Sequence, residues 1–277
     1  MRQQRKQIAQ ETLQIQQRGF YVQCNSRIDI MGAQKHSEET CKLITPNDGQ
    51  RLIKALVVPD YSALTACEVI NVSTVKVIMD IAVPDESVAA LNFASARNPG
   101  GGFLNGAMAQ EEALAISSGL YSTQLRHMTY YESNRTNKSM MYTDYAIYSP
   151  DVVFFRNTDF NLLENPVICS ILTLPAVNMG QVKAKGESIS KANQVMKDRM
   201  RLVLAILAAE GNKTIILGAY GCGVFGNDPT DIARWWRELL FDEKYGCYFS
   251  RVIFAVLDKP SGENIRAFKQ VFRGDSD

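Results

Sequence analysis

Residues 88–121 read VAALNFASARNPGGGFLNGAMAQEEALAISSGLY, and this stretch decides the fold class. Residues 88–94 form an almost unbroken apolar run, which predicts a β-strand that is buried on both faces. Three consecutive glycines follow at residues 100–102, and a helix is predicted to begin at about Ala109. A buried strand, a glycine-rich loop and a helix in this order are typical of an α/β protein.

The alternation of strands and helices continues on both sides of this stretch. Short apolar segments predict five further strands, at residues 68–72, 146–156, 167–177, 214–218 and 252–257. Helices are predicted up to Arg18, from Ser73 or Thr74 to residue 82, and over residues 187–210, 229–241 and 262–272. This alternation predicts an α/β fold with a largely parallel sheet.

The N-terminal part of the chain has a different character. The first 18 residues are rich in Gln, Arg and Lys with only a thin apolar stripe, and Gly19 supplies a stop signal. Residues 22–50 are polar and irregular, with short helices expected near residues 38–43 and 48–57. We therefore expect residues 1–66 to be a helical extension that packs on a core of residues 67–277.

Composition narrows the possible partners. Among 277 residues, 30 Lys and Arg balance 29 Asp and Glu, so the net charge is +1. Proteins that bind duplex nucleic acid usually carry a basic excess, so no such partner is expected. A small phosphorylated ligand stays compatible, because backbone amides and a helix N-terminus can bind one or two phosphates.

The numbers and spacing of cysteine and histidine argue against a metal site, and the apolar pattern argues against a membrane-spanning protein. The six cysteines form no CxxC pair and there are two histidines, so neither a metal nor a cofactor is expected. The first twenty residues are polar, and no apolar run approaches the ~20 residues that span a bilayer. We expect a monomer with free thiols in the cytoplasm, or in the nucleus if the source is eukaryotic.

Gly100, Gly101 and Gly102 are the first candidate binding residues. A run of glycines lets backbone amides approach a phosphate or a sugar closely. The alternative is a flexible linker. The position of the loop after a buried strand favours a binding site, because ligands in open α/β sheets bind beyond the carboxyl ends of the strands.

Gln110, Glu111 and Glu112 begin the helix that follows. Acidic residues at a helix N-terminus are often explained by the helix dipole alone. The alternative is a pair of working carboxylates, because adjacent helical residues project about 100° apart. One could hold a substrate hydroxyl while its neighbour, with a pKa raised by burial and by the nearby charge, acts as a general acid.

A second glycine loop, GAYGCGVFGND at residues 218–228, follows another predicted strand. Pro229 opens the next helix at its favoured first position, and the helix N-terminus adds partial positive charge. No Walker lysine is present, so the loop is not a P-loop. The tip aromatic could contact a sugar or fold onto the core. The candidate diphosphate-binding residues are Gly221, Cys222, Gly223, Val224, Phe225, Gly226 and Asn227.

Two glycine loops, one with a glutamate pair, suggest a nucleotide diphosphate sugar as ligand. The spacing GGG, seven residues, QEE resembles the signature of poly(ADP-ribose) glycohydrolases. The flanking NFASARNPGGGFLNGA and the later GAYGCGVFGNDP resemble the microbial-type branch of that family, as do IAQETLQIQQRGFY and YTDYAIYSPDVVFFRN. The resemblance therefore covers nearly the whole chain.

The resemblance implies a three-layer α/β/α macrodomain with a mixed, largely parallel central sheet. It also implies hydrolysis of the ribose–ribose O-glycosidic bond in poly(ADP-ribose), with release of ADP-ribose. Glu112 would be the catalytic acid, Glu111 would bind ribose hydroxyls, and Gln110 would support the catalytic loop. Residues 100–102 would line the distal ribose and the phosphates, and residues 221–227 would cradle the diphosphate, with Phe225 at the terminal ribose.

Other candidates carry weaker signals. Asn98 and Asn92 could bind ribose hydroxyls, although Asn in such loops is often only turn chemistry. Ser95 stands where the animal-type enzymes carry Asn, which leaves ribose recognition open. Phe254 could stack on adenine or be a core residue, and Asn178 could face the cleft.

Two rival functions remain. The same pocket could serve a hydrolase of mono-ADP-ribose on proteins or nucleic acid, or a non-catalytic reader of ADP-ribose. The two adjacent glutamates favour an enzyme, because binding an anionic diphosphate gains nothing from two extra carboxylates. ADP-ribosylated macromolecules are therefore the expected substrates, and ADP-ribose the expected product.

Overall fold

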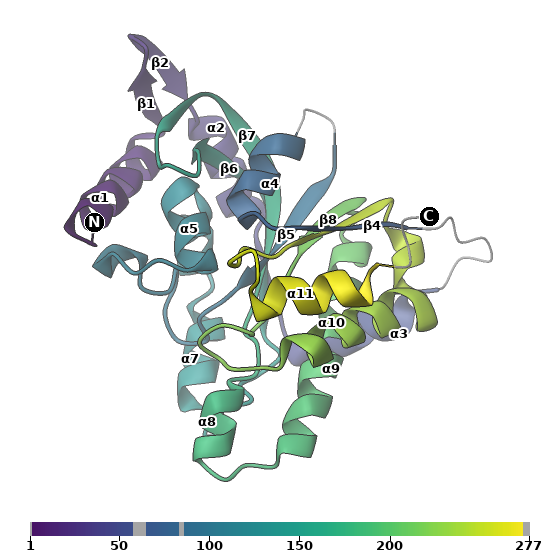
Figure 1. Ribbon diagram of the computed structural model, residues 1–277. Helices are drawn as coiled ribbons and strands as arrows, with labels where there is room; N and C mark the ends of the chain where they lie inside the picture. Colours follow the sequence, from purple (N-terminus) through teal and green to yellow (C-terminus); the bar gives the residue numbers. More distant parts are fainter. Residues whose placement is uncertain (1, 58–64, 83–85, 274–277) are drawn as a thin grey trace.

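A computed structural model describes residues 2–57, 65–82 and 86–273. Within these residues a seven-stranded sheet lies between two layers of helices (Figure 1). Its strands are β3 (Lys42–Ile44), β4 (Ala66–Ile70), β5 (Val88–Phe93), β6 (Ala146–Arg156), β7 (Leu162–Leu174), β8 (Thr214–Leu217) and β9 (Arg251–Ala255).

The strand order is β3-β6-β7-β5-β8-β9-β4. The pairs β3–β6 and β6–β7 are antiparallel, and the other four pairs are parallel. Only β6 therefore runs against the remaining strands of the described sheet. The predicted three-layer α/β/α fold with a mixed, largely parallel sheet is confirmed.

Helices cover both faces of this sheet. The α-helices are α1 (Arg2–Arg18), α2 (Met31–Thr40), α3 (Pro46–Ala55), α4 (Thr74–Ile81), α5 (Gln110–Ser117), α6 (Leu120–Leu125), α7 (Met128–Thr136), α8 (Met179–Ala184), α9 (Ile189–Ala209), α10 (Pro229–Arg237) and α11 (Glu263–Val271). Shorter helical turns are η1 (Phe103–Asn105), η2 (Glu238–Asp242) and η3 (Tyr245–Tyr248).

The central strand β5 is apolar at five of its six positions, and Asn92 is the exception. Ala89 and Leu91 belong to the core cluster that also contains α9, α10 and α11. Val88 and Ala90 point the other way, into the cluster with α4 and the end of α5. Because successive side chains of a strand face opposite sides, a strand between two helical layers needs apolar residues on both of its faces.

Side-chain caps begin two of the helices around the core, and the first of them was predicted. The Ser73 hydroxyl accepts from the Lys76 N–H at 3.2 Å, so the expected cap of α4 is present. Asp228 caps α10 by accepting from the N–H groups of Thr230 at 2.8 Å and Asp231 at 3.2 Å. Such a cap satisfies amides that have no partner inside the helix.

The N-terminal 66 residues differ from the purely helical segment expected from the sequence. A hairpin of β1 (Phe20–Gln23) and β2 (Ser26–Asp29) follows α1, with Cys24 and Asn25 at φ 50° and 63° in its turn. The helix expected near residues 38–43 is wrong, because α2 ends at Thr40 and residues 42–44 join the main sheet as edge strand β3. A three-residue strand is too short to show a period, so pairing with β6 decides its conformation.

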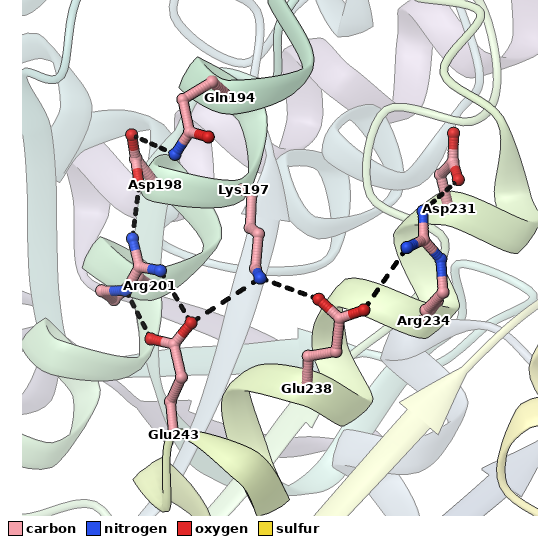
Figure 2. Close-up of polar contacts among 8 residues, drawn as sticks. All are labelled: Gln194, Lys197, Asp198, Arg201, Asp231, Arg234, Glu238 and Glu243. Carbon is pink, nitrogen blue, oxygen red and sulfur yellow. Dashed lines mark hydrogen bonds and ion pairs between the residues drawn. The ribbon is translucent and has the colours of Figure 1, made fainter.

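Figure 2 shows a run of ion pairs that joins α9 to α10 and η2. Arg201 donates to both carboxylate oxygens of Glu243, at 2.6 and 2.8 Å. Lys197 lies 2.7 Å from Glu238 and 3.7 Å from Glu243, and Arg234 continues the run from Glu238 at 3.4 Å. Isolated surface ion pairs contribute little to stability. The ion pairs here share partners, and together they connect α10 and η2 to α9.

Candidate active site

A cavity of about 880 Å³ opens where the carboxyl ends of the parallel strands meet. It is lined by Phe93 at the end of β5, Ala176 beyond β7, Ala219 beyond β8 and Val256 beyond β9. This edge is where ligands bind in open α/β sheets. The size of the cavity fits a ligand of several rings.

The cavity brings together the start of α5 and the second glycine loop. Its lining includes Gln110, Glu111 and Glu112 from the start of α5. It also includes four residues of the second loop, namely Gly221, Gly223, Val224 and Phe225. More than a hundred residues separate the two segments along the chain, so only the parallel sheet brings them together.

Glu111 lies at the buried end of this site, with 4% of its surface exposed. One carboxylate oxygen, Oε2, accepts from the Ser95 N–H at 2.7 Å. The other, Oε1, accepts from Asn92 Nδ2 at 3.2 Å and Gln124 Nε2 at 3.3 Å. Burial raises the pKa of Glu111 to about 8, although these donors favour the charged form and act in the opposite direction.

Gln124 connects this carboxylate to the first glycine loop. Its Oε1 accepts from the Gly100 N–H at 2.8 Å, while its Nε2 lies 3.4 Å from the Thr173 hydroxyl as well as close to Glu111. The side chain is fully buried. We did not predict Gln124 or Thr173 from the sequence, because nothing in their local pattern indicates that both are buried beside Glu111.

Glu112 is half-buried and makes a different set of contacts. Its Oε1 accepts from the Gly102 N–H at 2.8 Å. For Oε2, no hydrogen-bond donor is found in the part of the chain that the structure describes. Glu112 therefore holds one oxygen against the loop and keeps the other available to a ligand.

The three glycines fit around these carboxylates. Gly101 has φ +59°, and a Cβ there would overlap Glu112 Oε1 and lie 2.9 Å from Glu111 Oε2. Gly100 has φ +62° and would place a Cβ 2.7 Å from the Phe103 ring. The cavity lining does not include Gly100, Gly101 or Gly102. Their backbone lies against the glutamates, whereas the sequence suggested direct contact with the ligand.

Gln110 ties the start of α5 to the end of β5. Its Oε1 accepts from the Phe93 N–H at 2.9 Å, and its Nε2 donates to the Leu91 carbonyl at 2.8 Å. The same amide nitrogen lies 3.2 Å from the Thr74 hydroxyl. These bonds connect the helix turn that carries both glutamates to β5.

The second glycine loop is closed by its own backbone and by Asn227. Gly221 and Gly226 have φ +73° and +67°, a conformation that favours glycine. Asn227 is buried, and its Nδ2 donates to the carbonyls of Val177 at 2.8 Å and Gly221 at 3.0 Å. Asn227 therefore points into the loop, and neither it nor Gly226 lines the cavity.

The tip of this loop is open. A Cβ at Gly223 would meet nothing within 4 Å, and Val224 is 95% exposed. Phe225 is half-buried, with its ring centroid 6.0 Å from that of Tyr142. Cys222 does not line the cavity, and burial raises the pKa of its thiol, so it stays neutral.

Among the weaker candidates Ser95 lines the cavity, and the others lie apart from it or serve the fold. Asn98 is exposed and outside the lining; its backbone N–H donates to Ser95 Oγ at 3.1 Å. Phe254 is fully buried among aromatic rings of α11, so the alternative that it is a core residue is confirmed. Asn178 caps α8, and Asn92 is fully buried beneath Glu111.

Several lining residues come from segments that the sequence analysis did not connect with the site. They are Asn71, Val72, Ser73, Thr74, Val75 and Lys76 after β4, Thr158 and Phe160 between β6 and β7, Ala255 and Leu257 at the end of β9, and Asn264. The only available signal was the rule that segments following parallel strands converge at one edge of the sheet.

Two further findings concern metal and membrane. In residues 2–57, 65–82 and 86–273 no group of three or more His, Cys, Asp or Glu side chains is placed to hold a metal ion. None of the helices in this described part is long and apolar enough to cross a membrane.

Comparison with known proteins identifies the family. The family model for the catalytic domain of microbial-type poly(ADP-ribose) glycohydrolase (PARG) matches residues 9–157. The chain belongs to the microbial-type PARG family. The resemblance to this family is thereby confirmed, and the PARG family consists of glycosidases that act on poly(ADP-ribose).

Solved PARG structures match almost the whole chain. PARG from Thermomonospora curvata is 36% identical with a TM-score of 0.93, and the match covers 98% of this chain and 100% of that one. The same enzyme bound to the inhibitor ADP-HPD is 35% identical, with a TM-score of 0.89 and coverage of 97% and 99%. PARG from Deinococcus radiodurans in complex with ADP-ribose is 38% identical, with a TM-score of 0.82 and coverage of 89% and 98%. No curated protein sequence matches the chain.

Proposed function

We propose that the chain hydrolyses the ribose–ribose O-glycosidic bonds of poly(ADP-ribose) and releases ADP-ribose. Membership of the PARG family and the fold of the solved PARG structures support this activity. The observation that carries it is the pair Glu111 and Glu112 at one end of the cavity with the second glycine loop in the same lining. A bound nucleotide sugar could reach both features at once.

Glu112 is the proposed catalytic acid. Its Oε1 is held by the Gly102 N–H, so Oε2 is the oxygen that can carry a proton to the substrate. As the bond between the anomeric carbon and the ribose 2′-oxygen breaks, this proton passes to the leaving oxygen and positive charge develops on the sugar. Water then attacks the anomeric carbon and returns a proton to the Glu112 carboxylate. One acid performs both transfers, unlike the usual two-carboxylate arrangement.

Glu111 is proposed to hold a ribose hydroxyl beside the reacting bond. Because burial raises its pKa to about 8, it is mostly protonated at neutral pH. A neutral carboxyl group does not repel an incoming diphosphate. This gives the glutamate pair a way to coexist with an anionic substrate.

The second loop is proposed to bind the diphosphate. Gly221, Gly223 and Val224 line the cavity, and their backbone amides would bind the phosphates together with the partial positive charge at the N-terminus of α10. Phe225 is proposed to contact the terminal ribose. Asn227, Gly226 and Cys222 would act by shaping the loop rather than by touching the ligand.

We also propose which partners the chain meets and where it acts. ADP-ribosylated proteins or nucleic acids would present the polymer, and the chain would act as a monomer. The cytoplasm, or another reducing compartment, suits its six cysteines. Residues 1–66 are proposed to be an extension that serves the core of residues 67–277.

A single experiment separates the proposed activity from its rivals. Polymer labelled in its adenylate groups and a mono-ADP-ribosylated protein are each incubated with the wild type and with Glu112→Gln, and released ADP-ribose is measured by chromatography. We expect release from polymer by the wild type and almost none by the variant. Release from the mono-modified protein alone would identify a mono-ADP-ribosyl hydrolase. Binding of ADP-ribose without release from either substrate would identify a reader.

A further inference from the structure

Helix α1 lies against α5 and η1 in the folded chain, although about a hundred residues separate them in the sequence (Figure 1). Helix α5 carries the two glutamates, and η1 directly follows the first glycine loop. Ala9 of α1 packs in one small core with Phe103 of η1 and with Ala115 and Ile116 of α5. A displacement of α1 would therefore also move α5, the helix that carries Glu111 and Glu112.

Polar side chains of α1 satisfy the end of α5. The last carbonyls of a helix have no partner within the helix. Thr12 Oγ1 donates to the carbonyl of Ile116 at 2.8 Å, and Gln16 Nε2 donates to that of Ser118 at 2.7 Å. Both donors are buried, Thr12 completely. Since α5 has only eight residues, it depends on such tertiary contacts for its position.

The start of α1 holds η1, which follows the glycine loop. Arg5 Nε donates to the Gly106 carbonyl at 2.9 Å, and Arg2 Nε donates to the Asn105 carbonyl at 3.0 Å. The approach is close, because a Cβ at Gly106 would lie 2.5 Å from the Arg2 carbonyl oxygen. The Gly102 amide that binds Glu112 is only four residues away.

A buried arginine extends the same contact to the cavity wall. Arg156 is 3% exposed, donates from Nε to Thr12 Oγ1 at 3.1 Å and pairs with Glu11 at 2.7 Å. Its third contact is the Phe160 carbonyl at 2.8 Å. Phe160 lines the cavity and packs against the same apolar cluster as α5, so one group of side chains on α1 supports both α5 and this part of the cavity wall.

We propose that α1 is a positioning element of the reaction, with Thr12, Gln16 and Arg5 as positioning residues that keep Glu112 aligned with the cavity. The inference rests on the proposed glycohydrolase function. Bonds at the C-terminal end of α5 and at η1 hold the glutamate turn from two sides. Loss of either would let Glu112 shift relative to a bound sugar without removing any group that touches it.

The test uses matched variants of the full chain. Thr12→Val and Gln16→Leu remove the bonds to α5, and the double variant R2M/R5M removes those to η1 from a more exposed position that leaves the core intact. Gln14→Leu is the control, because Gln14 is on the same helix but exposed. Thr12→Ser keeps the hydroxyl. For each variant kcat and KM on poly(ADP-ribose) are measured per folded molecule, with the folded fraction taken from thermal unfolding.

We expect Thr12→Val, Gln16→Leu and R2M/R5M to lower kcat by about tenfold with KM within about twofold, since small misalignments are costly in the transition state. Thr12→Ser should restore kcat, and Gln14→Leu should match the wild type. Unchanged kcat in the three variants, whatever their stability, would overturn the inference and leave α1 a purely structural helix. If Thr12→Val and Gln16→Leu do not fold, the kcat of R2M/R5M decides. An inactive wild type would instead refute the proposed function.

Discussion

The loop of residues 100–102 and the loop of residues 221–227 are both rich in glycine, yet different groups hold them in place. In the first, neighbouring side chains occupy the amides: Gln124 binds the Gly100 N–H and Glu112 binds the Gly102 N–H. In the second, the loop closes on itself through Asn227, and its tip at Gly223 faces open space.

The difference separates two tasks that the sequence suggested for both loops. Amides that already donate to side chains of the protein are not available to a phosphate, so the first loop is suited to orienting Glu111 and Glu112. Free amides at an open tip, close to a helix N-terminus, are suited to an anion. Changes near the first loop are therefore expected to lower kcat, and changes in the second loop are expected to weaken the binding of ADP-ribose.

The largest effect is expected for Glu112→Gln. Gln cannot donate and recover the catalytic proton, so kcat on poly(ADP-ribose) should fall by about 10³-fold. The affinity for ADP-ribose, measured by calorimetry, should change little because the side-chain volume is kept. Loss of binding in parallel with kcat would contradict the division between the loops.

The next largest effect is expected when one glycine of each loop is replaced by alanine and the two kcat values are compared. Gly101→Ala places a methyl group on Glu112 Oε1 at φ +59°, so the carboxylate must move and kcat should fall by about 100-fold. Gly223→Ala adds the same group in open space and should leave kcat nearly unchanged. Steady-state kinetics on poly(ADP-ribose) would compare the two. Equal losses would show that the first loop has no special relation to Glu112.

A smaller effect is expected for Asn227→Ala in the second loop. The substitution removes the bonds to the Val177 and Gly221 carbonyls, each worth about 1 kcal/mol, and loosens the loop. The dissociation constant for ADP-ribose should rise by about tenfold, while kcat at saturating polymer stays close to that of the wild type. A fall in kcat with unchanged affinity would assign this loop to the chemical step.

The smallest effect concerns stability and pH. The pKa of Glu111 is raised to about 8 in the folded chain, above its ordinary value of 4.5, so the folded state holds the proton more tightly. Stability from this group is then present at low pH and is lost as pH rises toward 8. Melting temperatures of Glu111→Gln and the wild type should diverge in favour of the variant, by about a few degrees, between pH 5 and pH 8. A difference that is constant with pH would show that Glu111 is not protonated in the fold.

The strands and long helices near the site could be predicted from local patterns. The strand β5 is apolar on both faces, apart from Asn92, because it lies between two helical layers, and α10 begins at the predicted Pro229. The edge strand β3 was missed because three residues show no period, and its pairing with β6 is a long-range contact. Short elements depend on their partners more than on their own sequence.

The sequence by itself determined the class of fold, the family and the segments that carry the glutamates and the second loop. These features depend on local order: apolar runs, glycine spacing and adjacent acidic residues. Only the tertiary structure decided that Gly101 fits beneath Glu112, that Asn227 turns inward and that Thr12 of α1 holds the end of α5. The physical reason is that burial and hydrogen-bond partners depend on segments far apart in the chain, which meet only when the parallel sheet forms.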